Sequence, residues 1–167
     1  MTRLAEAARD MRLMLVEDNH GDVLLFRRAV ARLGLNIALE VAVSGEAALE
    51  RLRGGDPPDR RHLPDVPDLP DLPDLIVTDL NLAQMSGLEF LETMKSDPAL
   101  RRVPVLVMSS STRAADIAGA YDRHASGYFV KPVDVADYGR MLEAVDAYWR
   151  NLMQLPSAAL PGPRRDA

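Results

Sequence analysis

Cysteine is absent from this chain of 167 residues, which excludes disulfide bonds, thiolate metal sites and thiol nucleophiles. A long apolar run is also missing, since no segment approaches the roughly 20 apolar residues that a membrane-spanning helix needs. Residues 1–12 mix Arg, Glu and Ala and lack the apolar centre of a signal peptide. We therefore expect a cytoplasmic protein without a membrane segment.

Basic residues are not in excess either. The formal net charge of −5 argues against a nucleic-acid partner bound through a basic face. Hydrophobic residues make up 47% of the chain, which is enough for a core, and the length suits one domain. We expect that domain over residues 12–155, after an N-terminal extension (residues 1–11) and before a disordered, Pro-rich tail (residues 156–167).

Five short apolar runs alternate with segments of helical periodicity. The expected strands are residues 13–16, 37–43, 75–77, 105–108 and 128–130. The expected helix signals are a stop at Gly34, caps at Ser44 and Asp134, a capping box of Ser86 with Glu89, and a last helix running to Leu155. This alternation predicts an α/β fold with a doubly wound, five-stranded parallel sheet and helices on both faces.

Residues 54–73 stand outside this alternation. They contain a Pro-Asp repeat with a period of three, which predicts an extended, polyproline-like stretch rather than a packed element. We interpret it as a surface insertion, and a docking loop for a partner is the alternative.

Polar residues follow four of the five expected strands. Glu17 and Asp18 end the first, Asp79 the third, Ser109 the fourth and Lys131 the fifth. Because a doubly wound sheet binds ligands at the carboxyl ends of its strands, we expect these side chains to meet in one crevice. Taken singly, each has an ordinary explanation as a turn, cap or surface residue. Their coincidence at successive strand ends favours a site.

The chemistry of this set points to a phosphoryl group. Three acids close together repel one another, and a hard divalent cation such as Mg²⁺ would relieve that repulsion. Glu17, Asp18 and Asp79 are therefore the expected Mg²⁺ ligands, and Asp79 is the expected nucleophile toward phosphorus. Lys131 would supply a second cation, and the Ser109 hydroxyl would donate to a phosphoryl oxygen.

At these residues the chain resembles the receiver domains of two-component signalling. The resemblance covers roughly residues 11–149 and rests on four motifs: Leu15-Val16-Glu17-Asp18-Asn19, Leu75 to Leu82, Met85 to Phe90 and Gly127 to Pro132. It implies a flavodoxin-like (CheY-like) sheet of strand order 2-1-3-4-5. It also implies a response regulator, that is, a phosphoacceptor signalling protein rather than an enzyme acting on other substrates.

The resemblance assigns further roles. Asp79 would accept the phosphoryl group from a histidine kinase, and the backbone carbonyl of Asn81 would be a further Mg²⁺ ligand. Ser109 and Tyr128 would form a switch whose side chains move on phosphorylation. The peptide bond before Pro132 would be cis, as it usually is in the family.

A narrower resemblance is to regulators paired with bacterial phytochromes. It rests on residues 17–22 and 121–124 and on Trp149. His20 departs from that subgroup, which often has proline there, and the Pro-Asp insertion departs from the usual length. The implied partner is a sensor histidine kinase, with a bacteriophytochrome as the candidate. A relay to a histidine phosphotransfer protein stays open.

The last helix carries more apolar residues than one buried stripe needs: Val135, Tyr138, Met141, Leu142, Val145, Tyr148, Trp149, Leu152 and Met153. They belong either to the core alone or also to a homodimer interface, which we prefer. We expect no second domain after Trp149. Signalling would then depend on contacts made by the fourth helix, fifth strand and fifth helix.

Three other functions are weighed against this one. A phosphatase of the haloacid-dehalogenase type would have a second aspartate two residues after its nucleophile, where this chain has Asn81. A scaffold that is never phosphorylated would not need the complete set of side chains. A nucleotide-binding domain would have a Gly-rich turn after the first strand, where this chain has acids.

Overall fold

The computed structural model describes residues 10–54 and 72–152. Most of the N-terminal extension, nearly all of the Pro-Asp insertion and the C-terminal tail lie outside the described residues. Five strands form one parallel sheet: β1 (Met11–Val16), β2 (Ile37–Ala42), β3 (Leu75–Thr78), β4 (Val105–Ser109) and β5 (Gly127–Val130). The strand order is β2-β1-β3-β4-β5, which confirms the expected doubly wound, flavodoxin-like fold.

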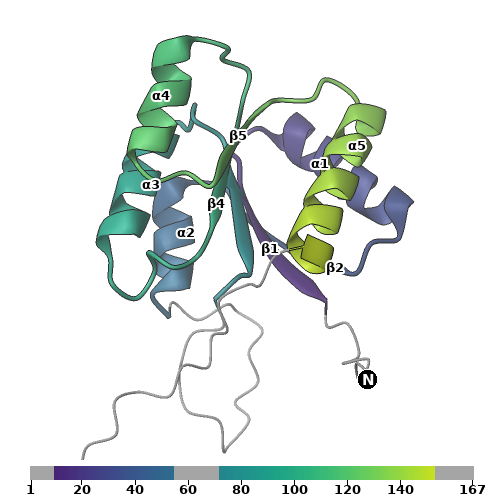
Figure 1. Ribbon diagram of the computed structural model, residues 1–167, viewed down its shortest axis with the longest axis horizontal. Helices are drawn as coiled ribbons and strands as arrows, with labels where there is room; N and C mark the ends of the chain where they lie inside the picture. The colour runs from purple at the N-terminus through teal and green to yellow at the C-terminus, as the bar shows by residue number, and fades with distance from the viewer. Residues whose placement is uncertain (1–9, 55–71, 153–167) are drawn as a thin grey trace, which may run out of the picture.

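Helices cover both faces of this sheet. They are α1 (His20–Leu33), α2 (Gly45–Leu52), α3 (Gly87–Ser96), α4 (Ala114–Asp122) and α5 (Val135–Asp146), followed by a π-helix, η1 (Ala147–Leu152). Figure 1 shows α1 and α5 on one side of the sheet and α2, α3 and α4 on the other. Among the described residues, no helix has the length and apolar character needed to span a bilayer.

Alternate strand residues fill two separate cores. Leu13 and Leu15 of β1 pack with Phe26 under α1 and α5. Met14 and Val16 of the same strand pack with the residues under α2, α3 and α4. This period of two follows from the pleat of a strand, and because both faces are covered, residues of both alternating sets in the central strands are mostly apolar.

The expected caps are confirmed. Ser44 and Asp134 accept backbone hydrogen bonds at the starts of α2 and α5, and Ser86 with Glu89 forms a capping box at α3. Asn19 caps α1 in the same way, which was not predicted from the sequence. Gly34 ends α1 with a φ of 58°, in the left-handed region that favours glycine.

Two boundaries differ from expectation. Strand β1 begins at Met11, which we expected in the extension, because its N–H donates to the Asn36 carbonyl at 2.9 Å and its side chain is buried. The last helix is α-helical to Asp146 and then π-helical, a change that apolar periodicity does not reveal. Its expected end at Leu155 lies outside the described residues.

Candidate functional site

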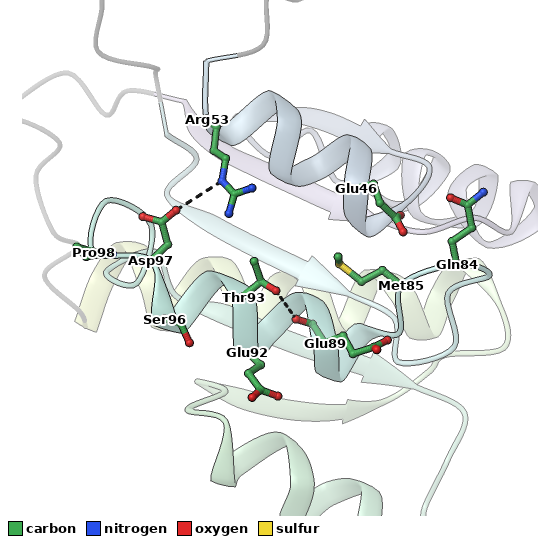
Figure 2. Close-up of a pocket in the computed structure, with 10 residues that line it drawn as sticks. All are labelled: Glu46, Arg53, Gln84, Met85, Glu89, Glu92, Thr93, Ser96, Asp97 and Pro98. Carbon is green, nitrogen blue, oxygen red and sulfur yellow. Dashed lines mark hydrogen bonds and ion pairs between the residues drawn. The ribbon is translucent and has the colours of Figure 1, made fainter.

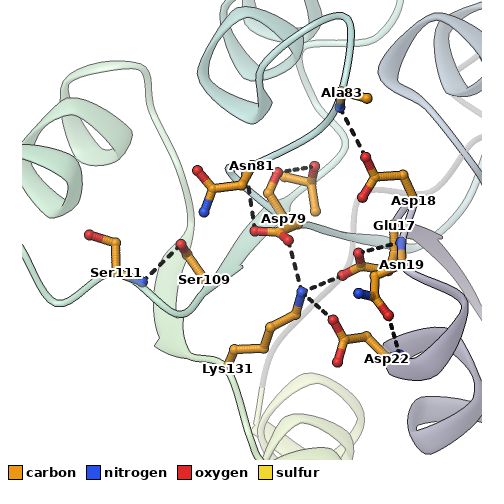
Figure 3. Close-up of polar contacts among 11 residues, drawn as sticks. Glu17, Asp18, Asn19, Asp22, Asp79, Asn81, Ala83, Ser109, Ser111 and Lys131 are labelled. Atoms are coloured by element: carbon orange, nitrogen blue, oxygen red, sulfur yellow. Dashed lines mark hydrogen bonds and ion pairs between the residues drawn. The ribbon is translucent and has the colours of Figure 1, made fainter.

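The sheet brings the predicted polar residues to one edge. Backbone hydrogen bonds continue one residue past the strands: the Asp79 N–H donates to Val16 at 3.1 Å, and the Lys131 N–H donates to Ser109 at 2.8 Å. These bonds fix the carboxyl ends of β1, β3, β4 and β5 side by side. Figure 3 shows the resulting cluster, in which Glu17, Asp79 and Lys131 face one another.

Lys131 lies at the centre of this cluster. Its Nζ is 2.8 Å from Oδ2 of Asp79, 2.8 Å from Oε2 of Glu17 and 2.8 Å from Oδ2 of Asp22. Burial alone would lower the pKa of Lys131, but hydrogen bonds to the three carboxylates outweigh burial and raise it. The ammonium group is therefore charged and is shared by three anions.

Asp79 is held at both carboxylate oxygens. Oδ1 accepts the N–H of Asn81 at 3.1 Å, and Oδ2 accepts from Lys131. The residue is buried, at 5% exposure, so its carboxylate is oriented by the protein. A carboxylate held in this way is placed to act as a nucleophile.

The acids after β1 have different surroundings. Glu17 is buried, and burial raises the pKa of its carboxyl, while Lys131 and the Asn19 N–H act in the opposite direction. Asp18 is exposed and accepts the N–H of Ala83 at 3.0 Å, which ties the β1 end to the loop after β3.

Ser109 and Tyr128 contact the same loop. The Ser109 Oγ is buried and accepts the Ser111 N–H at 3.2 Å, and the Tyr128 hydroxyl donates to the Ser111 carbonyl at 2.8 Å. The Ser111 hydroxyl in turn contacts Asp116 in α4 at 2.5 Å. Ser111 therefore links Ser109 to Tyr128 of β5 and to Asp116 of α4.

The donor chemistry of the site suits a hard divalent cation. Carboxylates of Glu17, Asp18 and Asp79 and the carbonyl of Asn81 are the oxygen ligands that Mg²⁺ prefers, and one ammonium does not balance the acids present. In this arrangement the carboxylates of Glu17, Asp22 and Asp79 gather around Lys131, and Asp18 lies apart on the Ala83 N–H. No group of three or more potential ligand side chains in the described residues is already arranged around a common metal position.

Two contributors were missed in the sequence. Asp22 reaches Lys131 from the first turn of α1, and its N–H is capped by the Asn19 side chain. Ser111 links Ser109 to Tyr128 mainly through its backbone. The spacing of Asp22 from Asn19 was a usable signal for Asp22, whereas backbone contacts of a loop leave no mark in the sequence.

One expectation is wrong. No peptide bond in the described residues is cis, so the bond before Pro132 is trans. Trans is the lower-energy isomer of an X–Pro bond by about 0.5–1 kcal/mol.

A larger hollow lies elsewhere on the surface. A groove of about 910 Å³ between α2 and α3 is lined by ten residues that include Glu46, Glu89, Glu92 and the ion pair of Arg53 with Asp97 (Figure 2). It contains none of the predicted site residues. The candidate site is therefore the carboxylate cluster at the sheet edge rather than this groove.

Comparisons with known proteins agree with this geometry. A family model described as the response regulator receiver domain matches residues 13–143. The chain is 34% identical over 150 residues to the probable methanogenesis regulatory protein FilR2 of Methanothrix harundinacea, covering 88% of each chain.

Two cyanobacterial regulators are similar as well. Response regulator Rcp1 of Synechocystis is 28% identical over 146 residues, covering 87% of this chain and 93% of Rcp1. A crystal structure of the Mn²⁺-bound form of a response regulator Rcp1 superposes with a TM-score of 0.71 at 26% identity, covering 88% of this chain and 99% of that chain. The crystal structure of the phosphorylated cyanobacterial phytochrome response regulator RcpA gives a TM-score of 0.73 at 31% identity, covering 89% of this chain and 99% of RcpA.

Proposed function

This chain belongs to the family of response regulator receiver domains, and on that premise we propose that it accepts a phosphoryl group on the carboxylate of Asp79. The observation that carries the proposal is the placement of Asp79, whose two carboxylate oxygens are held by the Asn81 N–H and the Lys131 ammonium. The phosphoryl donor is a histidine kinase, which two-component signalling implies.

The residues divide the chemistry among them. A carboxylate oxygen of Asp79 attacks phosphorus while the bond from phosphorus to the donor nitrogen breaks. Lys131 already touches Asp79, so its charge is available to the incoming phosphoryl oxygens, and the Ser109 hydroxyl can donate to the same group. Bound Mg²⁺ would supply further positive charge, and Glu17, Asp18, Asp79 and the Asn81 carbonyl are the residues that we propose to hold it.

Phosphorylation would then change the surface formed by α4, β5 and α5. It adds about −1.5 to −2 charges at Asp79. A Ser109 hydroxyl that turns toward those charges gives up its contact with Ser111, and Tyr128 loses the fixed position of its acceptor. These two side chains are the bistable element of the proposed switch.

The proposed partners follow from the same similarities. The kinase is a sensor histidine kinase, and the likeness to RcpA favours a phytochrome. A histidine phosphotransfer protein remains the alternative downstream acceptor. The proposal includes a cytoplasmic location and no nucleic-acid or membrane partner.

We also propose a homodimer through the last helix, although fewer of its apolar side chains are available for an interface than the sequence suggested. Tyr138, Leu142, Val145 and Trp149 are buried in the chain's own core. The apolar side chains left exposed near α5 are Val130, Val133 and Tyr148, at 57%, 82% and 48% exposure.

The test of the proposal is a phosphorylation assay with acetyl phosphate and Mg²⁺, followed by intact-protein mass spectrometry. We expect one phosphoryl adduct on the wild type and none on Asp79→Asn. Asp122→Asn, which removes an exposed acid in α4, serves as the control and should behave as the wild type. An adduct that persists in Asp79→Asn, or a wild type that stays unmodified, would contradict the proposal.

A further inference from the structure

Tyr138 is a buried polar residue that the proposed phosphoryl transfer does not use. It lies in the first half of α5, is 0% exposed, and packs its ring edge-on against Phe26 of α1 at a centroid distance of 5.9 Å. Its hydroxyl is fully buried and has no hydrogen-bond partner among the described residues. A buried hydroxyl without a partner is costly and rare in native proteins, so it calls for an explanation.

Tyr138 packs one helical turn from a residue of the carboxylate cluster. Its ring contacts Phe26, and Asp22 precedes Phe26 by four residues, so both lie on the same face of α1, the face that α5 covers. Burial raises the pKa of Tyr138 to about 12, and Asp22 is the strongest charged contributor to that rise. The phenol therefore stays protonated and is a hydrogen-bond donor throughout the physiological pH range.

The cluster has few donors for its acceptors. The Lys131 ammonium has three N–H groups, and carboxylates of Asp79, Glu17 and Asp22 surround it at 2.8 Å each. When Asp79 carries a phosphoryl group, Lys131 is needed at the phosphoryl oxygens. At least one carboxylate that binds Lys131 in the unmodified protein would then lose its donor. Asp22 is the carboxylate that reaches Lys131 from α1, the helix that α5 covers.

We propose that Tyr138 is a positioning residue whose hydroxyl donates to Asp22 when Lys131 turns to the phosphoryl group, so that α5 responds directly to phosphorylation. This inference rests on the proposed phosphorylation of Asp79. It gives the orphaned hydroxyl a partner in the modified state, and it adds a route to α5 that is separate from Ser109, Ser111 and Tyr128.

The test is the affinity for beryllofluoride, a phosphoryl mimic, measured with Mg²⁺ by isothermal titration calorimetry on the full chain. Tyr138→Phe keeps the ring against Phe26 and removes only the hydroxyl. We expect it to bind the mimic about tenfold more weakly than the wild type, since a hydrogen bond to a charged group is lost. The unmodified variant should be at least as stable as the wild type in urea, because no hydrogen bond is lost in that state.

Two controls separate this role from a merely structural one. Tyr121→Phe removes an exposed hydroxyl and should leave the affinity unchanged. In an Asp22→Ala background the acceptor is gone, so adding Tyr138→Phe should cause no further loss of affinity.

The inference is overturned if Tyr138→Phe binds as the wild type does, if its loss is equally large in the Asp22→Ala background, or if the unmodified variant is itself destabilised. A wild type that does not bind the mimic overturns the proposed function, and this inference with it. Normal binding by the wild type together with normal binding by Tyr138→Phe overturns this inference alone.

Discussion

At the scale of single residues, the site is a problem of charge balance. One ammonium, that of Lys131, is shared by Glu17, Asp22 and Asp79. Burial still raises the pKa of Glu17 despite its contact with Lys131. The unmodified protein thus holds a carboxylate that would be better solvated in the unfolded chain. A cation that binds at this site would stabilise the folded protein.

The raised pKa of Glu17 gives stability a defined pH dependence. Folded Glu17 binds its proton more tightly than unfolded Glu17, whose pKa is near 4.5, so its contribution is most favourable below that value. As pH rises from there through the folded pKa, this contribution is lost. Glutamine does not ionise, so Glu17→Gln should not lose stability in this way as pH rises. We expect the variant to have a larger free energy of unfolding than the wild type at pH 7, in urea unfolding measured from pH 4.5 to 8.

Glu89 provides a control of opposite sign. Hydrogen bonds from the backbone and hydroxyl of Ser86 lower its pKa, so its contribution is present above pH 4.5 and is lost as pH falls through the folded pKa. Glu89→Gln should therefore lose stability at pH 7. If Glu17→Gln were destabilised at pH 7 as well, the account of an overcharged site would be wrong.

At the scale of elements, α3 is placed against the end of β3 by a glycine. A Cβ atom at Gly87 would lie 2.0 Å from the Asp79 carbonyl oxygen, well inside van der Waals contact. The N–H of Gly87 donates to the Leu80 carbonyl at 2.9 Å, which holds the start of α3 in this position. The close approach fixes the chain at Asp79 and Leu80, directly after β3.

We expect Gly87→Ala to destabilise the protein by about 1–3 kcal/mol, because the added methyl group must displace the backbone. The matched control is Gly139→Ala in α5, where the nearest atom would be 3.9 Å away. There the helix propensity of alanine should stabilise by about 0.5–1 kcal/mol. Chemical denaturation of both variants checks this, and equal effects would refute the role of Gly87.

Much of the order and placement of the helices and strands was predictable from the sequence. Apolar strand runs and the caps at Ser44, Ser86 and Asp134 are local signals, and they place most elements within a few residues. The polar residues that follow the strands also predicted the cluster of Glu17, Asp79 and Lys131, because parallel strands bring their carboxyl ends together.

The features that the sequence did not predict depend on contacts between segments that are distant in the chain. The start of β1 at Met11 is decided by its pairing with Asn36, and the third carboxylate on Lys131 comes from α1. The isomer of the bond before Pro132 was inferred from a family habit and not from local residues, and it is trans. The orphaned Tyr138 hydroxyl depends on how α5 packs on α1, which apolar periodicity alone does not describe.

At the scale of the whole molecule, the receiver domain exposes two valines near its proposed switch. Val130 and Val133 flank Lys131 in the chain, just before α5, whereas the exposed Tyr148 lies in η1, beyond the other end of α5. A surface so close to the site can couple phosphorylation to association with a second copy of the chain.

We expect the wild type to sediment as a dimer at micromolar concentrations and Val133→Asp to sediment as a monomer, because a charge at an apolar interface must lose its water. Val43→Asp, at another exposed valine beyond the end of β2, should leave the dimer intact. A wild type that is monomeric with and without phosphorylation would remove the homodimer from the account.

The central claim is tested most directly by locating the phosphoryl group itself. The wild type is incubated with a small phosphodonor and Mg²⁺, digested, and sequenced by tandem mass spectrometry. The account predicts a single modification, on the carboxylate of Asp79, that forms much more slowly when the divalent cation is chelated. A modification found on another residue, or no modification in the presence of the metal, would contradict it.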